Sequence, residues 1–167
     1  MPLTLSPDQV AFLLGPLSMN VGAVGRDGWP CVTRAQGVVV ARDRRSLTVL
    51  LSAARSQAVL DALAGGSAIT LVASRPATHA TLQLKAARAE RVPVTAAHRT
   101  ASAHCVSAFG AELAALGYGD AVAGALAAIL STEDLAALRF APEIVFDQTP
   151  GPQAGTVLAR APDVAAP

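Results

Sequence analysis

The stretch LTVLLSAARSQ, residues 47–57, contains the change of pattern around which the rest of the sequence is organised. Its first half, Leu47 to Leu51, has the apolar and β-branched character of a strand. Apolar residues at helical spacing follow as far as Gly65-Gly66, a typical helix end. The stretch therefore predicts a strand that leads directly into a helix from Arg55 to Ala64.

Polar groups gather where this strand becomes a helix. Free backbone N–H groups and the positive end of the helix dipole favour an anion there, and Ser52, Arg55 and Ser56 can add hydroxyl and charged contacts. Arg34, on the neighbouring predicted strand, can reach the same anion. The alternative interpretation, which the pattern by itself favours, is structural: Ser52 caps the helix and Arg55 is a solvated residue of its first turn.

Further strands are predicted on both sides of this stretch. Met19 to Val24 and Pro30 to Ala41 have strand character, and Arg26-Asp27-Gly28 between them is a signal of tight reversal. Ile69 to Ala73 resumes as a strand after the helix. The clearest alternation runs from His79 to Ala86, with polar side chains on one face and apolar side chains on the other. These patterns predict an antiparallel sheet.

Three further helices are predicted outside the sheet. Ser6-Pro7-Asp8-Gln9 has the form of a capping box and begins a short helix. Thr95 can cap a long helix that runs to about Leu116, and a second, Ala-rich helix is predicted from Asp120 to Leu130.

The C-terminal part has weaker patterns. We expect Leu135 to Leu138 to continue as a brief helical turn and Phe140 to Phe146 to form the last strand, at an edge or a bulge because of Pro142. No regular structure is expected beyond this strand. We therefore assign residues 1–152 to a single domain and residues 153–167 to a flexible C-terminal tail.

Composition limits the class of protein. Hydrophobic residues make up 52% of the 167 residues but aromatic residues only 4%, so the core must consist mainly of small aliphatic side chains. The formal net charge is +1, which provides no broad basic face for a phosphate backbone. We predict that the protein does not bind nucleic acid.

The expected location follows from cysteine usage and hydropathy. Cys31 and Cys105 lie in different predicted elements, and a chain of this size needs no disulfide. Residues 1–8 lack the features of a secretory signal, and the longest apolar run, Ala121 to Leu130, is far shorter than the roughly 20 residues of a membrane span. We expect a cytoplasmic protein that does not contact a membrane.

Common catalytic and metal-binding patterns are not found. His98, His104 and Cys105 do not have the spacing of a zinc site, so we predict no metal. There is no nucleophile elbow for Ser-His-Asp catalysis. His79 is the only titratable candidate near the predicted groove, and no catalytic residue is assigned.

The order of the predicted elements resembles the pyridoxamine 5'-phosphate oxidase-like FMN-binding split-barrel superfamily over about residues 17–92. That superfamily has a hairpin with a D-G-x-P turn, then a strand ending in a small polar stretch, then S-x-K or S-R-K at a helix start. The corresponding residues here are Asp27-Gly28-Trp29-Pro30, Ser52 and Arg55-Ser56-Gln57. Residues 88–92 also resemble the strand that closes the superfamily's barrel. The resemblance implies an α+β fold: a six-stranded antiparallel split β-barrel with flanking helices and an Ala-rich helical segment before the last strand.

The resemblance also implies a function and a site. It implies a homodimer that holds FMN between its subunits and acts as an oxidoreductase on a small-molecule substrate, with the flavin supplying the redox chemistry. The implied phosphate-binding residues are Arg34, Ser52, Arg55 and Ser56, with Gln57 beside them. Thr81 and Gln83 are the implied contacts of the isoalloxazine ring.

Two departures from the superfamily pattern leave alternatives open. Gln57 stands where the superfamily has a phosphate-binding Lys, and Phe140 to Phe146 stands in place of a C-terminal Arg motif for substrate recognition. Vitamin B6 oxidation is therefore not supported. The lost cation leaves two alternatives: a dimer that uses a deazaflavin or haem, and a non-catalytic binding module that has lost its cofactor.

Overall fold

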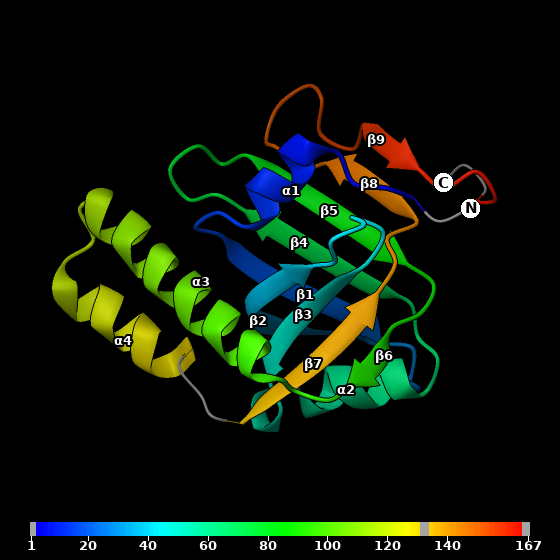
Figure 1. Cartoon of the computed structure of the whole chain (residues 1–167), viewed down its shortest axis with the longest axis horizontal. Helices are drawn as coiled ribbons and strands as arrows, with labels where there is room; N and C mark the ends of the chain where they lie inside the picture. Colours follow the sequence, from blue (N-terminus) through cyan, green and yellow to red (C-terminus); the bar gives the residue numbers. More distant parts are fainter. Residues whose placement is uncertain (1–2, 131–133, 165–167) are drawn as a thin grey trace.

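The computed structural model shows a large antiparallel sheet flanked by helices (Figure 1). It describes residues 3–130 and 134–164. The described residues form nine strands in the order β6-β7-β3-β2-β1-β4-β5-β8-β9. All strand pairs are antiparallel. The strands are β1 (Ser18–Val24), β2 (Pro30–Val40), β3 (Leu47–Ser52), β4 (Ile69–Ser74), β5 (Thr81–Ala86), β6 (Glu90–Val92), β7 (Leu135–Phe140), β8 (Ile144–Asp147) and β9 (Val157–Arg160).

The helices flank this sheet. They are α1 (Pro7–Leu13), the 3₁₀ turn η1 (Ala54–Ser56), α2 (Gln57–Ala64), α3 (Ala96–Ala115) and α4 (Asp120–Leu130). Helix α3 packs along β2 and α4 packs against α3, so the helical segment forms a layer of its own beside the sheet (Figure 1). Helix α2 contacts the other side of β1 and β2. The turn η1 connects the end of β3 to the start of α2.

Helix starts follow the sequence signals. The Ser6 hydroxyl accepts a hydrogen bond from the Gln9 N–H at 3.1 Å, and the Gln9 side chain accepts one from the Ser6 N–H. Thr95 and His98 form the same reciprocal arrangement at the start of α3. Both predicted caps are confirmed.

The main core is aliphatic, as the composition predicts. Its fully buried side chains come from alternate positions of the strands, such as Val49, Leu71 and Leu84, and Val59 and Leu63 of α2 join the same cluster. A second, smaller cluster lies between the two long helices and consists of Val106, Phe109, Leu113 and Leu130, with Leu126 packed against it. The long helices therefore have a core of their own.

Two expectations about the sheet are wrong. The described residues form nine strands rather than six, and no pairing among them closes the sheet, because β6 and β9 lie at opposite ends of the strand order. Two of the added strands, β6 and β9, are short and lie at the margins, where sequence patterns are weak, and the third, β7, pairs between β6 and β3.

The C-terminal part also differs from the sequence prediction. Leu135 to Phe140 is strand β7, not a helical turn, because it pairs with β3 on one side and β6 on the other. The last predicted strand begins only at Ile144. Val157–Arg160 forms β9 on β8, so the expectation of no regular structure in this region is wrong.

Candidate functional site

The backbone amides after β3 are already hydrogen-bonded by this chain. The Ala53 N–H donates to the backbone oxygen of Asp134 at 2.8 Å, and the Ala54 N–H donates to the Asp134 carboxylate oxygen Oδ2 at 2.8 Å. The Arg55 N–H lies 3.4 Å from the Ser52 hydroxyl, which accepts its hydrogen bond. Of the amides that the sequence predicts to hold an anion, that of Ala54 therefore faces an anionic side chain, and those of Ala53 and Arg55 bond uncharged oxygens of the same molecule.

The side chain of Arg55 is held by helix α4. Its Nη1 donates to the backbone oxygen of Ile129, in the last turn of α4. A cation at this end of a helix is favourable because the last carbonyls carry partial negative charge. Arg55 is therefore engaged by the helical segment rather than free beside Ser52.

Ser56 and Gln57 point away from Arg34. The Ser56 hydroxyl is buried and lies 2.8 Å from the hydroxyl of Thr33. Thr33 precedes Arg34 on β2, and successive strand residues face opposite sides of a sheet. The Gln57 side-chain amide donates to the Asp61 carboxylate at 2.7 Å along α2.

Arg34 lies under α3 in an unusual environment. Its guanidinium carbon is 5.0 Å from the centroid of the Phe109 ring, and its Nε is buried without a hydrogen-bond partner among the described residues. Burial lowers the pKa of Arg34, because desolvation disfavours the charged form. The side-chain oxygen of Gln36, a residue only 3% exposed, is likewise buried without a partner in the described part of the chain.

Strand register shows which predicted site residues lie together. Ala35 pairs with Leu51, so one step further along the antiparallel ladder brings Arg34 opposite Ser52. On the other side, Arg34 pairs with Asn20, Asn20 with Val72, and Val72 with Gln83. Gln83 therefore lies in the same row as Arg34 but three strand spacings away, about 14 Å.

The two predicted ring-binding residues have partners within the sheet. The Gln83 side-chain oxygen accepts a hydrogen bond from Gln148 at 3.0 Å. The Thr81 hydroxyl is 2.9 Å from both the Ser74 hydroxyl and the backbone oxygen of His79. His79 itself lies outside β5 with a positive φ of 58° and an exposed side chain.

The structure thus places Arg34 and Ser52 at successive positions beyond the Ala35–Leu51 pair, with Gln83 further along the row of Arg34 and Ser56 on the interior side. Sequence reasoning missed Asp134 and Phe109. Asp134 gave no signal because it lies 80 residues from Ala54 and next to a segment that was expected to be helical. Phe109 was expected on the apolar side of its helix, but its contact with a cation has no sequence signature.

The fold has counterparts among solved structures. A proposed pyridoxamine 5'-phosphate oxidase from Lactobacillus delbrueckii is 18% identical with a TM-score of 0.53, over 87% of this chain and 99% of that one. HupZ from Group A Streptococcus is 13% identical with a TM-score of 0.54, over 91% and 100%. The chain has the pyridoxamine 5'-phosphate oxidase-like fold. No family model and no curated protein matches its sequence.

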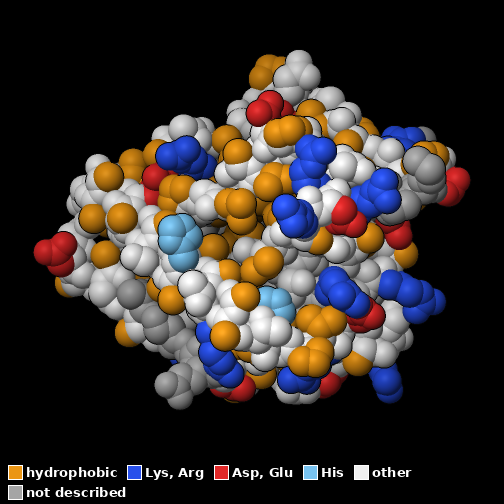
Figure 2. Space-filling view, viewed as in Figure 1, with side chains coloured by type: hydrophobic (Ala, Val, Ile, Leu, Met, Phe, Trp, Pro, Cys, Tyr) orange, Lys and Arg blue, Asp and Glu red, His pale blue; other side chains and the backbone are white. Residues whose placement is uncertain are grey.

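Metal sites and membrane-spanning helices are not found among the described residues. Within residues 3–130 and 134–164, no three His, Cys, Asp or Glu side chains gather in a way that could hold a metal ion. No helix in the same ranges has the length and hydrophobicity needed to cross a membrane. On the face shown in Figure 2, Lys and Arg side chains are interspersed with Asp and Glu, and hydrophobic side chains gather near the middle.

Proposed function

We propose that this chain is an FMN-binding, flavin-dependent oxidoreductase that works as a homodimer on a small-molecule substrate. Its proposed phosphate contact is Arg34, supported by Ser52 on the adjacent strand. The observation that carries the proposal is the buried, unpartnered Nε of Arg34. The fold supports it, because a solved structure of the same fold is named for pyridoxamine 5'-phosphate oxidase activity.

A buried guanidinium Nε–H without an acceptor is costly to a folded protein. Desolvation of a charged group is offset only by pairing or hydrogen bonds, and the Phe109 ring provides just part of that compensation. A phosphate would supply acceptor oxygens and the opposite charge, and guanidinium groups bind phosphate well. The chemistry of Arg34 therefore fits a phosphorylated ligand.

The space around Arg34 does not fit a phosphate in this conformation. The cavity lined by Arg34, Gln36 and Phe109 has a volume of about 10 Å³, close to the minimum for one water molecule. Leu130, at the end of α4, lines it as well. Binding of FMN at Arg34 therefore requires the helical segment to move.

The test is a titration of the purified protein with FMN and with riboflavin, followed by flavin fluorescence and visible absorption. Riboflavin lacks the phosphate, so Arg34→Met should weaken FMN binding at least tenfold and leave riboflavin binding unchanged, since charge-assisted hydrogen bonds contribute about 1.5–3 kcal/mol. Arg88→Met, which removes an exposed cation near β6, is the matched control. A protein that binds neither flavin would contradict the proposal.

A second candidate function is favoured by the contact between Asp134 and Ala54. An internal carboxylate at the predicted phosphate position suits a non-catalytic split-barrel module that binds no flavin. Titration with a deazaflavin and with haem in the same assay tests the remaining cofactor alternatives, because a ligand at one hundred times its dissociation constant raises stability by about 2.7 kcal/mol.

A further inference from the structure

The second half of α3 and the whole of α4, residues 106–130, form a unit that we call the cover. Its apolar side chains pack on each other in the small cluster of Val106, Phe109, Leu113 and Leu130, separately from the main core. Most of the outer surface of α4 is exposed, including Val122 and Ile129. A segment with few links to the main core can open at low cost while the rest of the fold stays intact.

The cover contacts Arg34, the proposed phosphate contact, and also Arg55. The Phe109 ring lies over the guanidinium of Arg34, and the backbone oxygen of Ile129 accepts a hydrogen bond from Arg55. Leu130 and Val106 close the remaining space beside Arg34. An anion can therefore reach the buried Arg34 Nε only when the cover is displaced.

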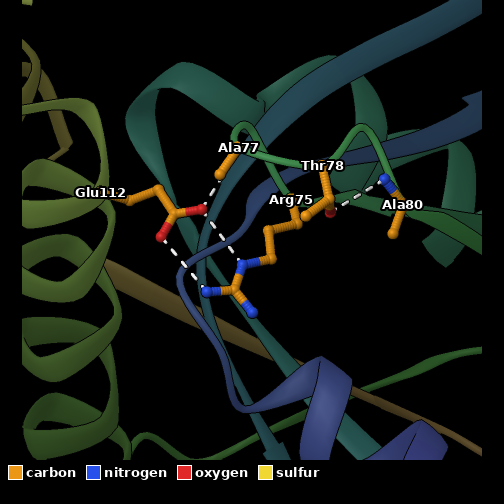
Figure 3. Close-up of polar contacts among 5 residues, drawn as sticks. All are labelled: Arg75, Ala77, Thr78, Ala80 and Glu112. Atoms are coloured by element: carbon orange, nitrogen blue, oxygen red, sulfur yellow. Dashed lines mark hydrogen bonds and ion pairs between the residues drawn. The ribbon is translucent and has the colours of Figure 1, made fainter. Parts of the chain in front are cut away.

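A third contact fixes the cover to the loop between β4 and β5 (Figure 3). The Arg75 Nε donates to Glu112 Oε1 at 3.1 Å, and its second nitrogen lies 3.5 Å from Oε2. The Ala77 N–H donates to Glu112 Oε1 at 3.3 Å. Arg75 is 46% exposed at its side chain, so this ion pair lies at the solvent boundary and not in a core.

The first half of α3 is held more tightly. A Cβ atom at Gly37 of β2 would lie 3.1 Å from the Ser102 Cα, so the two backbones approach closely there. Cys105, one turn later, is also buried against β2. The fixed half of α3 and the looser cover thus meet near residue 105.

We propose that the cover closes the site over Arg34, that it lifts when an anionic ligand binds, and that the Arg75–Glu112 ion pair is its latch. The proposal rests on the proposed function for the identity of the anion, the phosphate of FMN. A ligand that binds only the lifted state has an apparent affinity reduced by the fraction of molecules in that state. Weakening the latch raises this fraction and so raises the affinity for FMN.

The test compares FMN binding by wild-type protein, Arg75→Gln, Glu112→Gln and the double variant. Each single substitution should tighten FMN binding roughly two- to fivefold, the range expected from loss of one exposed ion pair. The double variant should gain no more than either single variant, because both remove the same interaction. Riboflavin, which does not need the arginines, should bind all four proteins equally.

The control is Glu90→Gln, which breaks a different ion pair, Arg139–Glu90, away from the cover. It should leave FMN binding unchanged. Amide hydrogen exchange supplies an independent measurement: FMN should accelerate exchange in residues 106–130 and riboflavin should not.

The possible results separate the two proposals. Suppose that wild-type protein binds FMN, the latch variants bind it no better, and exchange in the cover does not rise. The proposal that the cover lifts is then contradicted, and the proposed flavin binding is not. Equal gains for riboflavin and FMN would also overturn it. If neither wild-type nor any variant binds FMN, the proposed function fails and this inference fails with it.

Discussion

The guanidinium carbon of Arg34 on β2 lies 5.0 Å from the centroid of the Phe109 ring on α3. A cation over an aromatic face is stabilised by the ring quadrupole, and by more when both groups are desolvated. This contact joins the residue most suited to a phosphate with the helical segment that covers it. The same pair therefore affects both stability and ligand access.

Replacing Arg34 with Met should stabilise the protein while it weakens FMN binding. The substitution removes a half-buried charge whose buried Nε lacks a partner in the described structure, and it keeps a long apolar side chain against Phe109. We expect the free energy of unfolding to rise by about 1 kcal/mol, or roughly 2–4 °C in Tm for a chain of this size. Thermal unfolding monitored by circular dichroism checks this. A lower Tm would mean that the cation itself supports the fold.

Asp134→Asn should strengthen FMN binding and leave riboflavin binding unchanged. The asparagine oxygen can still accept the Ala54 hydrogen bond, but the negative charge next to the proposed phosphate position is lost. Removing one like charge at the solvent boundary should improve affinity by about three- to tenfold. Fluorescence titration measures it. If FMN does not bind either protein, the non-catalytic module is favoured.

Gly37→Ala should destabilise the protein. Its new Cβ would lie 3.1 Å from the Cα of Ser102 and 3.4 Å from the backbone oxygen of Ala101, and neither backbone atom can move without shifting α3. The expected cost is about 1–3 kcal/mol, measured by denaturant unfolding. Gly110→Ala, in the same helix with nothing within 4 Å, is the control and should stabilise by about 0.5–1 kcal/mol.

Ser56→Ala should lower stability without changing FMN affinity. The substitution leaves the buried Thr33 hydroxyl without its partner, at a cost of about 1–3 kcal/mol. Thr33→Val combined with Ser56→Ala should recover part of the loss, because both polar groups are then removed. Chemical denaturation and flavin titration of the three variants check this. Weaker FMN binding in Ser56→Ala would place Ser56 in the ligand site instead.

Acidification should open the latch. The hydrogen bond from Arg75 holds the pKa of Glu112 below the usual glutamate value. A lowered pKa in the folded state gives stabilisation that is present above the ordinary glutamate pKa, about 4.3, and is lost as the pH falls through the lowered value. Exchange in the cover should therefore be slower in wild-type than in Glu112→Gln near neutral pH, and this difference should vanish once the pH falls below the lowered pKa of Glu112. A difference that persists in acid would contradict the assignment.

Local signals predicted the parts of the fold that local chemistry determines. The capping residues Ser6 and Thr95 gave the starts of α1 and α3, and α4 spans Asp120–Leu130 as expected. The hairpin turn was also predicted correctly, with Gly28 at a φ of 82°.

Strand β7 shows where such signals fail. Leu135-Ala136-Ala137-Leu138 has no β-branched residue and favours a helix by propensity, but strands on both sides hold it extended. Tertiary pairing therefore overrode the local preference. The short strand β9, four residues long, was missed because its pattern is weak and its pairing with β8 is the main signal of its presence.

For the candidate site, the sequence predicted that Arg34 and Ser52 belong to neighbouring strands, and β2 and β3 are paired in the structure. The contacts that Asp134 and Phe109 make with this region depend on residues 75 to 80 positions away, and no local pattern encodes them.

The two outermost strands of the sheet, β6 and β9, contain three and four residues. A strand this short offers few unpaired backbone groups to an incoming chain. Charged side chains also lie on both strands: Glu90 and Arg91 on β6, and Arg160 on β9. Growth of the sheet by edge-to-edge addition is therefore disfavoured at both margins. The short, charged edges therefore protect the molecule from polymerising through its backbone. Self-association would have to use side chains on its broad surfaces.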